Sequence, residues 1–459
     1  MQDIGKQNWE YAHRLFRCVA TASRPLRVEE LAEFLAFDFD TESTPIFRAD
    51  WRSEDPAYAV RSTCSSLLAV VDMDGSPVIQ FAHFSVKEYL TSKRLAKAKH
   101  TISRFYVSMT PAHTVVAQAC LAVLLHLDEN VTKDDLKNYP LAEYAAKHWV
   151  THAQFEDVSP KIQNEMKRLF DPNKHHLAVC VWIYDSTPFI HRSERPSRLS
   201  ATPLHYAALW GLHDVVEFLI VEHTQDVNSQ YSYNYDTPLC MASKKGHLEV
   251  VRVLLEYSAN TEFQGRSGGN PLHRASIEGR TEVARILLEY CVAVDAKNKY
   301  NNTALYLGSL HGRLEVVRLL LEHGGDANSR NENDLSPLHC AKDEGITRVL
   351  LQYGADSNIR DKYDRTPLHR ASTFNRVEAA KVLLEHGVDV NPLNSINQTL
   401  LHLASEKGHL DLVLLLLQRG SDIHAQDIEG QTPFQKASEY EHYDVMQLLL
   451  EHGAYDHRA

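Results

Sequence analysis

Residues 81–90 read FAHFSVKEYL and place a histidine, a serine, a lysine and a glutamate within ten positions. A serine near a histidine could act as a nucleophile beside its general base. The same residues also fit the start of a helix, because Ser85 and Glu88 match a capping box in which each side chain bonds the other residue's free backbone N–H. We favour the helix start, since a serine held in a cap is poorly placed to attack a substrate. This interpretation leaves only His83 and Lys87 without a structural role.

A second pattern, HWVTH at 148–152, could hold a metal ion. It places His148 and His152 one helical turn apart, as zinc-binding helices do. A tryptophan stands where the general-base glutamate of such a motif would be, so we favour packing of both histidines. The sequence also contains no G-x-S-x-G, kinase or paired-carboxylate motif. We therefore expect no enzymatic activity, no metal ion and no cofactor.

The chain has 459 residues and a net charge of −12, with 44% hydrophobic and 24% charged residues. These values are ordinary for a globular protein of two or three domains. Residues 201–459 hold 24 basic against 35 acidic residues and so carry −11 of the total. An acidic surface repels phosphate backbones, so we expect no nucleic-acid partner.

The seven cysteines are scattered and form no C-x-x-C pair, which indicates isolated core thiols in a reducing compartment. The N-terminal residues lack an apolar signal segment. The longest apolar run, residues 115–127, is too short to span a bilayer and predicts a buried helix. We expect an intracellular protein without a membrane partner, in the cytoplasm rather than the nucleus.

The C-terminal half repeats one pattern. TPLHYA begins at 202, and related hexapeptides begin at 237, 270, 303, 336, 366, 399 and 432. Thr or Ser before Pro caps a first helix, and paired aliphatics, as in GHLEVVRVLLEYSAN (246–260), form a second helix. One such unit cannot bury its own apolar face, whereas a stack forms a continuous core. The units resemble ankyrin repeats, and the resemblance implies a solenoid of about eight repeats over 201–459.

The histidine of TPLH recurs in five of these units. A metal array is one interpretation. We favour a hydrogen-bonding role within the repeat, because no cysteine or carboxylate ligand recurs beside the histidine. The five positions are His205, His273, His339, His369 and His402.

Departures from the period indicate where a partner binds. The first repeat has two extra residues in the loop SQYSYNYD (229–236). Ankyrin proteins, as a family, bind partners through hairpin tips and the concave face of the first helices, and exposed tyrosines suit such contacts. The alternative is that these tyrosines fold back over the first repeat. The predicted contact residues are Trp210, Tyr231, Tyr233, Tyr235, Lys244, Lys245, Tyr300 and Tyr363.

The fifth repeat is three residues short. Nine positions separate Gly345 from Gly354, where the other repeats have twelve. We expect the loss to remove most of a turn from the second helix and to create a local soft point.

The first hundred residues follow a different order. Helical periodicity covers 8–22 and 27–37, a helical then extended segment covers 55–71, and a turn at 72–77 precedes a strand at 78–83. Three helices followed by a hairpin form a winged helix. Its second helix carries Glu29, Glu30 and Glu33, so we expect protein packing and no DNA recognition.

The first hundred residues contain HRLFRCVATASRPLRVEELAEFLAF, then a hairpin, then FAHFSVKEYLTSKRL. Together these parts are similar to the winged-helix segment of fungal NACHT–ankyrin proteins, which are NOD-like signalling NTPases. PLAEYAAKHWVTHAQ (140–154) is similar to the helical segment that follows in that family. The resemblance implies a mainly α chain with a winged-helix (α+β) domain at 1–100, a helical connector at 101–185 and a linker at 186–200 before the repeats.

The family's P-loop, G-x-x-x-x-G-K-[ST], is missing, because the only Gly-Lys pair is Gly5-Lys6 and it is followed by Gln7. The resemblance therefore implies the regulatory half of such a receptor. We expect a non-enzymatic scaffold or sensor whose solenoid binds a partner protein. Two alternatives are the C-terminal part of a signalling NTPase with its P-loop upstream, and an ankyrin-type transcriptional or pathway coregulator.

Overall fold

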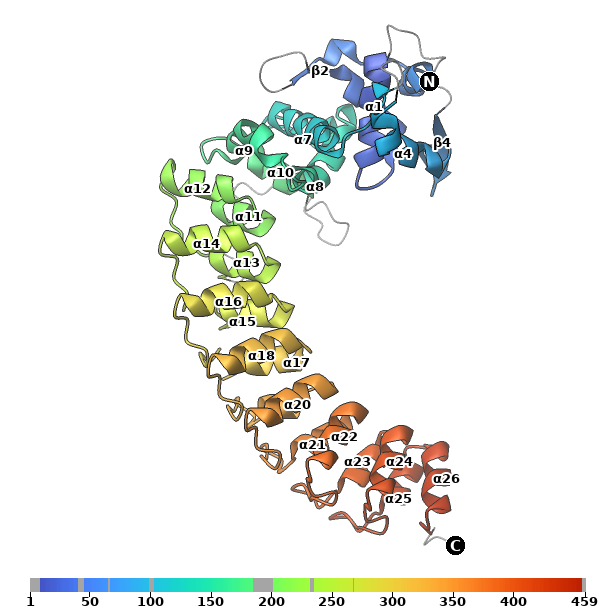
Figure 1. Ribbon diagram of the computed structural model, residues 1–459, viewed down its shortest axis with the longest axis vertical. Helices are drawn as coiled ribbons and strands as arrows, with labels where there is room; N and C mark the ends of the chain where they lie inside the picture. Colours follow the sequence, from blue (N-terminus) through green and yellow to red (C-terminus); the bar gives the residue numbers. More distant parts are fainter. Residues whose placement is uncertain are drawn as a thin grey trace. The chain divides into compact units, whose positions relative to one another are not determined.

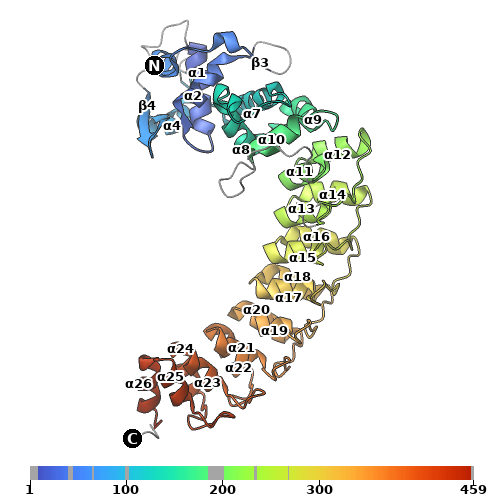
Figure 2. The same ribbon diagram turned by 180° about the vertical axis from the view of Figure 1, so that it is seen from behind.

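A computed structural model of the chain describes residues 9–39, 45–64, 67–98, 103–184, 201–231, 235–266 and 268–455. The predicted linker 186–200 and Tyr233 lie outside the described residues. The chain divides into two compact units, 1–225 and 226–459. Helices dominate both units, and the predicted mainly α fold class is confirmed (Figures 1 and 2).

The first part of unit 1 is a winged helix. Helices α1 (Trp9–Thr21), α2 (Val28–Glu33) and α3 (Pro56–Cys64) precede a hairpin of β4 (Leu68–Met73) and β5 (Ser76–Phe81). Strand β1 (Leu26–Arg27) completes an antiparallel sheet of order β1-β5-β4, in which Ile79 pairs with both Leu26 and Val70. A two-residue turn at Asp74-Gly75 with positive φ closes the hairpin, as its right-handed twist requires. Short pairing of β2 (Phe37–Asp38) with β3 (Ile46–Phe47) and helices α4 (Phe84–Leu90) and α5 (Lys93–Ala96) complete the domain.

The second part of unit 1 is helical. It contains α7 (Met109–His126), α8 (Leu141–Ala153), α9 (Gln163–Phe170) and α10 (His176–Tyr184), and the helix pair of the first repeat, α11 (Pro203–Trp210) and α12 (His213–Val221), belongs to the same unit. Helix α7 is long and apolar enough to cross a membrane by composition, but 61% of its residues are buried inside the unit. This confirms the prediction of a buried helix at 115–127.

Unit 2 stacks seven helix pairs (Figure 1). Each first helix begins one residue after a predicted cap, and two of the first helices end directly at a glycine with positive φ, Gly246 and Gly279. The pairs are α13 (Pro238–Lys245) with α14 (Leu248–Glu256), α15 (Pro271–Glu278) with α16 (Thr281–Glu289), α17 (Ala304–Leu310) with α18 (Leu314–Glu322), α19 (Pro337–Cys340) with α20 (Glu344–Gln352), α21 (Pro367–Thr373) with α22 (Val377–Glu385), α23 (Leu400–Glu406) with α24 (Leu410–Gln418), and α25 (Pro433–Glu439) with α26 (Tyr443–Glu451).

The deletion in the fifth repeat falls in its first helix, so the prediction that the second helix is shortened was wrong. Helix α19 has four residues, whereas α20 has the full nine. Ala341 leaves the helix with an extended ψ of 126°, and Asp343 then caps α20 by accepting from Ile346 N at 2.9 Å. This side-chain cap lets a complete second helix start without the left-handed residue that the other repeats place between their helices.

The same change removes a contact between repeats. In other repeats, the side chain before the second helix donates to a carbonyl of the preceding repeat, as Arg313 does to Ile277 O at 2.9 Å and His409 to Thr373 O at 3.1 Å. Asp343 occupies this position in the fifth repeat, and its carboxylate has no proton to donate. We predict faster amide hydrogen exchange in α19 and residues 341–343 than in α17 or α21. Equal protection of the three segments in a mass-spectrometric exchange experiment would contradict this.

Six of the seven cysteines are buried, but Cys291 is exposed, which corrects the expectation of core thiols at all seven positions. Cys291 follows the second helix of its repeat and has a φ of 59°. Gly324, Gly354 and Gly387 adopt positive φ at the corresponding positions. At a helix terminus that requires positive φ, the side chain of the residue points into solvent. The residue type alone does not reveal that Cys291 has this position.

Candidate partner-binding site

FAHFSVKEYL starts a helix, as predicted, but the cap is His83 and not Ser85. Helix α4 begins at Phe84, and His83 Nδ1 accepts from Ser85 N–H at 3.2 Å. The same nitrogen lies 2.7 Å from Ser85 Oγ. His83 adopts an extended backbone (φ −148°, ψ 144°), which is the conformation of a capping residue. In the part of the chain that the structure describes, no carboxylate contacts the His83 ring, so the pair lacks the third group that orients a catalytic base.

The histidines of HWVTH pack inside unit 1, as predicted. His152 is fully buried, and its Nε2 lies 2.9 Å from the Tyr144 hydroxyl, which accepts from Ser23 N–H at 3.0 Å. His152 Nδ1 lies 2.9 Å from His113 Nδ1. Burial lowers the pKa of His152 to about 3 and also lowers that of His113, so both rings are neutral at physiological pH. The Tyr144 hydroxyl can then donate to His152 Nε2, and His152 Nδ1–H can donate to His113 Nδ1. Among the described residues, no group of three or more metal-ligating side chains occurs.

The recurrent histidine of the repeats forms hydrogen bonds within and between repeats, which confirms the predicted role. In the fifth repeat, His339 Nδ1 accepts from Ser336 N–H at 3.1 Å, and Nε2 donates to Arg365 O at 3.0 Å. His402 repeats this arrangement with Thr399 N–H at 3.2 Å and Gln431 O at 2.9 Å. These two buried rings, and His273 through Asn302 O at 3.0 Å, therefore tie the start of a first helix to the hairpin loop that precedes the next repeat.

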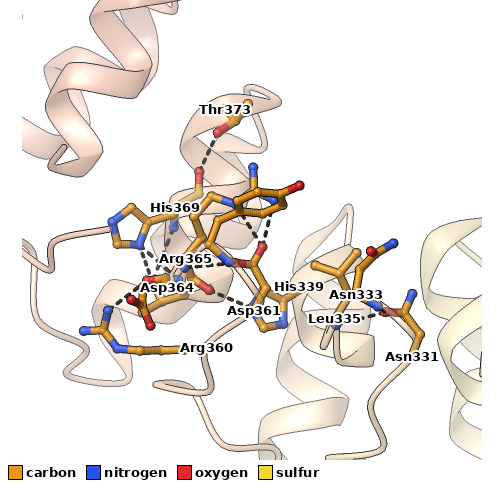
Figure 3. Close-up of polar contacts among 12 residues, drawn as sticks. Asn331, Asn333, Leu335, His339, Arg360, Asp361, Asp364, Arg365, His369 and Thr373 are labelled. Carbon is orange, nitrogen blue, oxygen red and sulfur yellow. Dashed lines mark hydrogen bonds and ion pairs between the residues drawn. The ribbon is translucent and has the colours of Figure 1, made fainter. Parts of the chain in front are cut away.

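These hairpin loops, here called fingers, have one internal geometry. In the sixth repeat, Asp361 Oδ1 accepts from Tyr363 N–H at 2.8 Å and Arg365 N–H at 3.0 Å, and its other oxygen lies 2.8 Å from the Arg365 guanidinium (Figure 3). Asn331 makes the same pair of bonds to Asn333 and Leu335 in the fifth repeat. Asx side chains that bond the backbone two and four residues on fix the turn locally.

Backbone bonds join successive finger tips into a ladder. The N–H of Glu332 donates to Tyr300 O at 3.0 Å, and the N–H of Lys362 donates to Asn333 O at 3.3 Å. The N–H of Ser395 donates to Tyr363 O at 3.1 Å. The ladder holds the tips of the fourth to seventh repeats in register, so side chains at the tips form a fixed row.

The tips display large side chains to solvent. Tyr300 is 43% exposed and Tyr363 59%, whereas the first helices behind them are largely buried. Lys299 Nζ lies 4.7 Å from the Tyr300 ring centroid, and the Arg365 guanidinium lies 4.8 Å from that of Tyr363, so cation–π contacts support both rings. Rigid, exposed aromatic rings on an ordered backbone are suited to protein recognition.

The predicted loop residues lie at the first finger of unit 2. Tyr231 is half-buried, and its N–H donates to Asp236 O at 2.9 Å. Tyr235 is 48% exposed and has a φ of 57°, at a position where later fingers place Gly268 or Asn301. A tyrosine in the left-handed region costs stability that the chain could have avoided with Gly or Asn. Lys244 and Lys245 are exposed in the last turn of α13.

Trp210 belongs to unit 1 and lies in an aromatic cluster there. Its ring meets those of Trp149 and Phe170 edge-on, both at 5.8 Å between centroids, and that of Tyr206 at 5.7 Å. This packing joins the first repeat to α8 and α9, which accounts for the grouping of residues 201–225 with the connector. Trp210 thus has an intramolecular role, and its contact with a partner stays a prediction.

The sequence did not predict the ladder of backbone bonds between the fingers, because repeat spacing does not reveal which loops bond to each other.

Comparison with known families places both parts of the chain. A model for ankyrin repeats (three copies) matches residues 204–298, 239–331 and 323–394, and a second, for ankyrin repeats (many copies), matches 401–450. A model for the winged helix domain of GPI inositol-deacylase matches residues 2–103. The chain is therefore an ankyrin-repeat protein with an N-terminal winged-helix domain.

A curated relative is similar to part of the chain. The azaphilone pigments biosynthesis cluster protein L of Monascus ruber is 29% identical over 266 residues, which cover 54% of this chain. The same match covers 55% of the relative, so the chain spans about half the length of the curated relative it matches.

Proposed function

We propose that this chain is a non-enzymatic scaffold that binds a partner protein through the row of fingers along its solenoid, here called the finger row. We further propose that it is the regulatory half of a NACHT-type receptor. Ankyrin repeats support a role in protein interaction. The observation that carries the proposal is the ladder that holds Tyr300 and Tyr363 exposed and in register. The presence of a winged-helix domain in the same chain as the repeats supports the receptor class. We place its action in the cytoplasm, which cell fractionation tests.

The direct test is affinity capture from native cell extract by two matched variants. Tyr300→Ala with Tyr363→Ala removes both tip rings. Tyr290→Ala with Tyr353→Ala removes two equally exposed tyrosines, each 45% exposed, at the ends of second helices. We expect the tip variant to lose the partner by about tenfold or more, as for buried aromatic anchors, and the control to retain it. Equal retention by both variants would refute the finger row as the site.

Substitution of Tyr235 should have opposite effects on stability and on partner binding. Tyr235→Asn places at this position the residue type that Asn301 and Asn397 supply in later fingers with φ values of 56° and 57°. We expect unfolding in urea to require about 1 kcal/mol more free energy, because the left-handed strain is relieved, and partner capture to weaken. A variant that is neither more stable nor weaker in capture would show that Tyr235 is an ordinary loop residue.

The signalling NTPase alternative has its own test. The resemblance to NACHT–ankyrin proteins supports it. In-frame coding sequence for G-x-x-x-x-G-K-[ST] upstream of the first codon would establish a nucleotide-binding segment. The coregulator alternative predicts nuclear enrichment in the same fractionation that tests the cytoplasmic assignment.

A further inference from the structure

Three consecutive fingers carry a row of cations at one structural position. Lys297 Nζ donates to Arg330 O at 3.3 Å, Arg330 Nη1 donates to Arg360 O at 3.4 Å, and Arg360 Nη1 donates to Leu393 O at 2.8 Å. Each side chain thus reaches the backbone of the same position in the next finger. The three residues are exposed, and we call them the cation row.

The cation row is not neutralised within the chain. Among the described residues, no carboxylate lies within 4.0 Å of Lys297, Arg330 or Arg360, which bond only to neutral carbonyls. Figure 3 shows this difference in one finger, where Arg365 pairs with the Asp361 carboxylate and Arg360 donates to the backbone carbonyl of Asp364. A charge whose only partners are carbonyl dipoles keeps its long-range attraction for an anion.

Three of the five cations on the second helices of unit 2 pair with carboxylates, in contrast to the cation row. Arg285 lies 3.4 Å from Glu282, Lys381 lies 3.1 Å from Glu378, and Arg348 contacts carboxylates at 2.7 and 2.9 Å. In unit 2 the second helices hold twelve acidic and five basic residues, whereas the first helices hold three acidic and five basic. The negative charge of unit 2 is therefore concentrated on its second helices, which repel an anionic partner. The fingers at 296–302, 329–335 and 359–365 together hold six basic and four acidic residues, so an anion is not repelled there by net charge.

Apolar contacts accompany the cation row. Tyr300 and Tyr363 stand at the tips of the first and third of these fingers, and Leu393, 45% exposed, takes the position of the cation row in the next finger. Lys299 and Lys362, next to the tip tyrosines, are exposed and also lack a carboxylate within 4.0 Å among the described residues. A ligand that fits must offer carboxylates and apolar side chains at short intervals along one chain.

We propose that the fingers at 296–302, 329–335 and 359–365 bind an extended acidic segment of the partner protein, whose carboxylates pair with Lys297, Arg330 and Arg360 and whose apolar side chains pack on Tyr300 and Tyr363. The inference rests on the proposed function and names the chemistry of its partner. A nucleic acid is the competing anion, and the net charge of −12 disfavours it because phosphates occur at every nucleotide and meet the acidic second helices as well.

The test uses fluorescence anisotropy with the full chain and three labelled probes. The first is a twelve-residue peptide of alternating Glu and Leu, the second has Gln for every Glu, and the third is a single-stranded oligonucleotide of equal length. The finger variant carries Lys297→Gln, Arg330→Gln and Arg360→Gln. The matched control carries Arg285→Gln, Arg348→Gln and Lys381→Gln, which removes the same charge from second helices.

We expect the Glu peptide to bind, the finger variant to bind it about tenfold or more weakly, and the control to stay within about twofold, since exposed pairs contribute individually little but add along a row. Binding should weaken as salt is raised. Equal binding of the Gln peptide, equal loss in both variants, or tighter binding of the oligonucleotide through the same residues would each overturn the proposal. If the natural partner is lost by the Tyr300 and Tyr363 double variant but kept by the finger variant, the proposed function stands and the acidic segment falls.

Discussion

Acidification from pH 7.5 to 5 should destabilise the chain by several kcal/mol. Burial lowers the pKa of His339 and His369 to about 4, from an ordinary value near 6.5. The unfolded chain therefore binds more protons than the folded chain between these values, so the stability is full above pH 6.5 and is lost as the pH falls toward 4. At pH 5, a pKa shift of this size lowers the free energy of unfolding by roughly 2 kcal/mol per histidine. Burial lowers the pKa of His273 and His402 as well.

The eighth repeat supplies a control for this prediction. Gln435 stands where five of the other repeats have histidine, and its Oε1 accepts from Thr432 N–H at 2.8 Å. His339→Gln and His369→Gln therefore preserve the capping bond without a titrating ring. Urea denaturation at pH 7.5 and 5 should show a smaller loss of stability for this double variant than for the wild-type chain. Equal losses would mean that these two histidines do not control the acid sensitivity.

The second large effect is expected at Gly268, where the fingers of the third and fourth repeats approach. A Cβ atom at this position would lie 2.3 Å from Lys299 N and 2.8 Å from Lys299 Cβ, and the φ of Gly268 is +73°. The clash is with backbone, so it can be relieved only by separating the two fingers. We expect Gly268→Ala to lower the free energy of unfolding by about 3 kcal/mol or more.

Gly312→Ala separates the effect of backbone strain from the effect of the clash with Lys299. Gly312 has a nearly equal φ of +71°, but a Cβ atom there meets no atom within 4 Å. Its substitution should cost about 1 kcal/mol from backbone strain alone. Urea denaturation of both variants measures the difference. Equal effects would mean that the close approach of the third and fourth fingers is absent in solution.

The sequence predicted the features that depend on local residue patterns. Thr237 and its equivalents cap the first helices, and His339 and His402 bond the caps, because a capping geometry involves only neighbouring residues. The winged-helix order followed from periodicity in the same way. Local patterns also misled at one point, since S-x-x-E at Ser85 fitted a capping box while the extended backbone made His83 the cap.

Features that depend on stacking could not be read from the sequence. A length difference of three residues does not say which helix lost them, and Asp343 decided this by capping a complete α20. The finger ladder and the cation row arise only when successive loops lie side by side. Tyr300 and Tyr363 could be chosen as exposed tip residues, but their common register depends on bonds between repeats.

A partner that binds the fingers should protect their backbone N–H groups from hydrogen exchange. The most direct measurement compares exchange in the chain alone with exchange in the chain bound to its captured partner. We predict that added protection falls in the fingers at 296–302, 329–335 and 359–365, and that the second helices α16, α18 and α20 are unchanged. Protection confined to those second helices or to the winged-helix domain would contradict binding at the fingers.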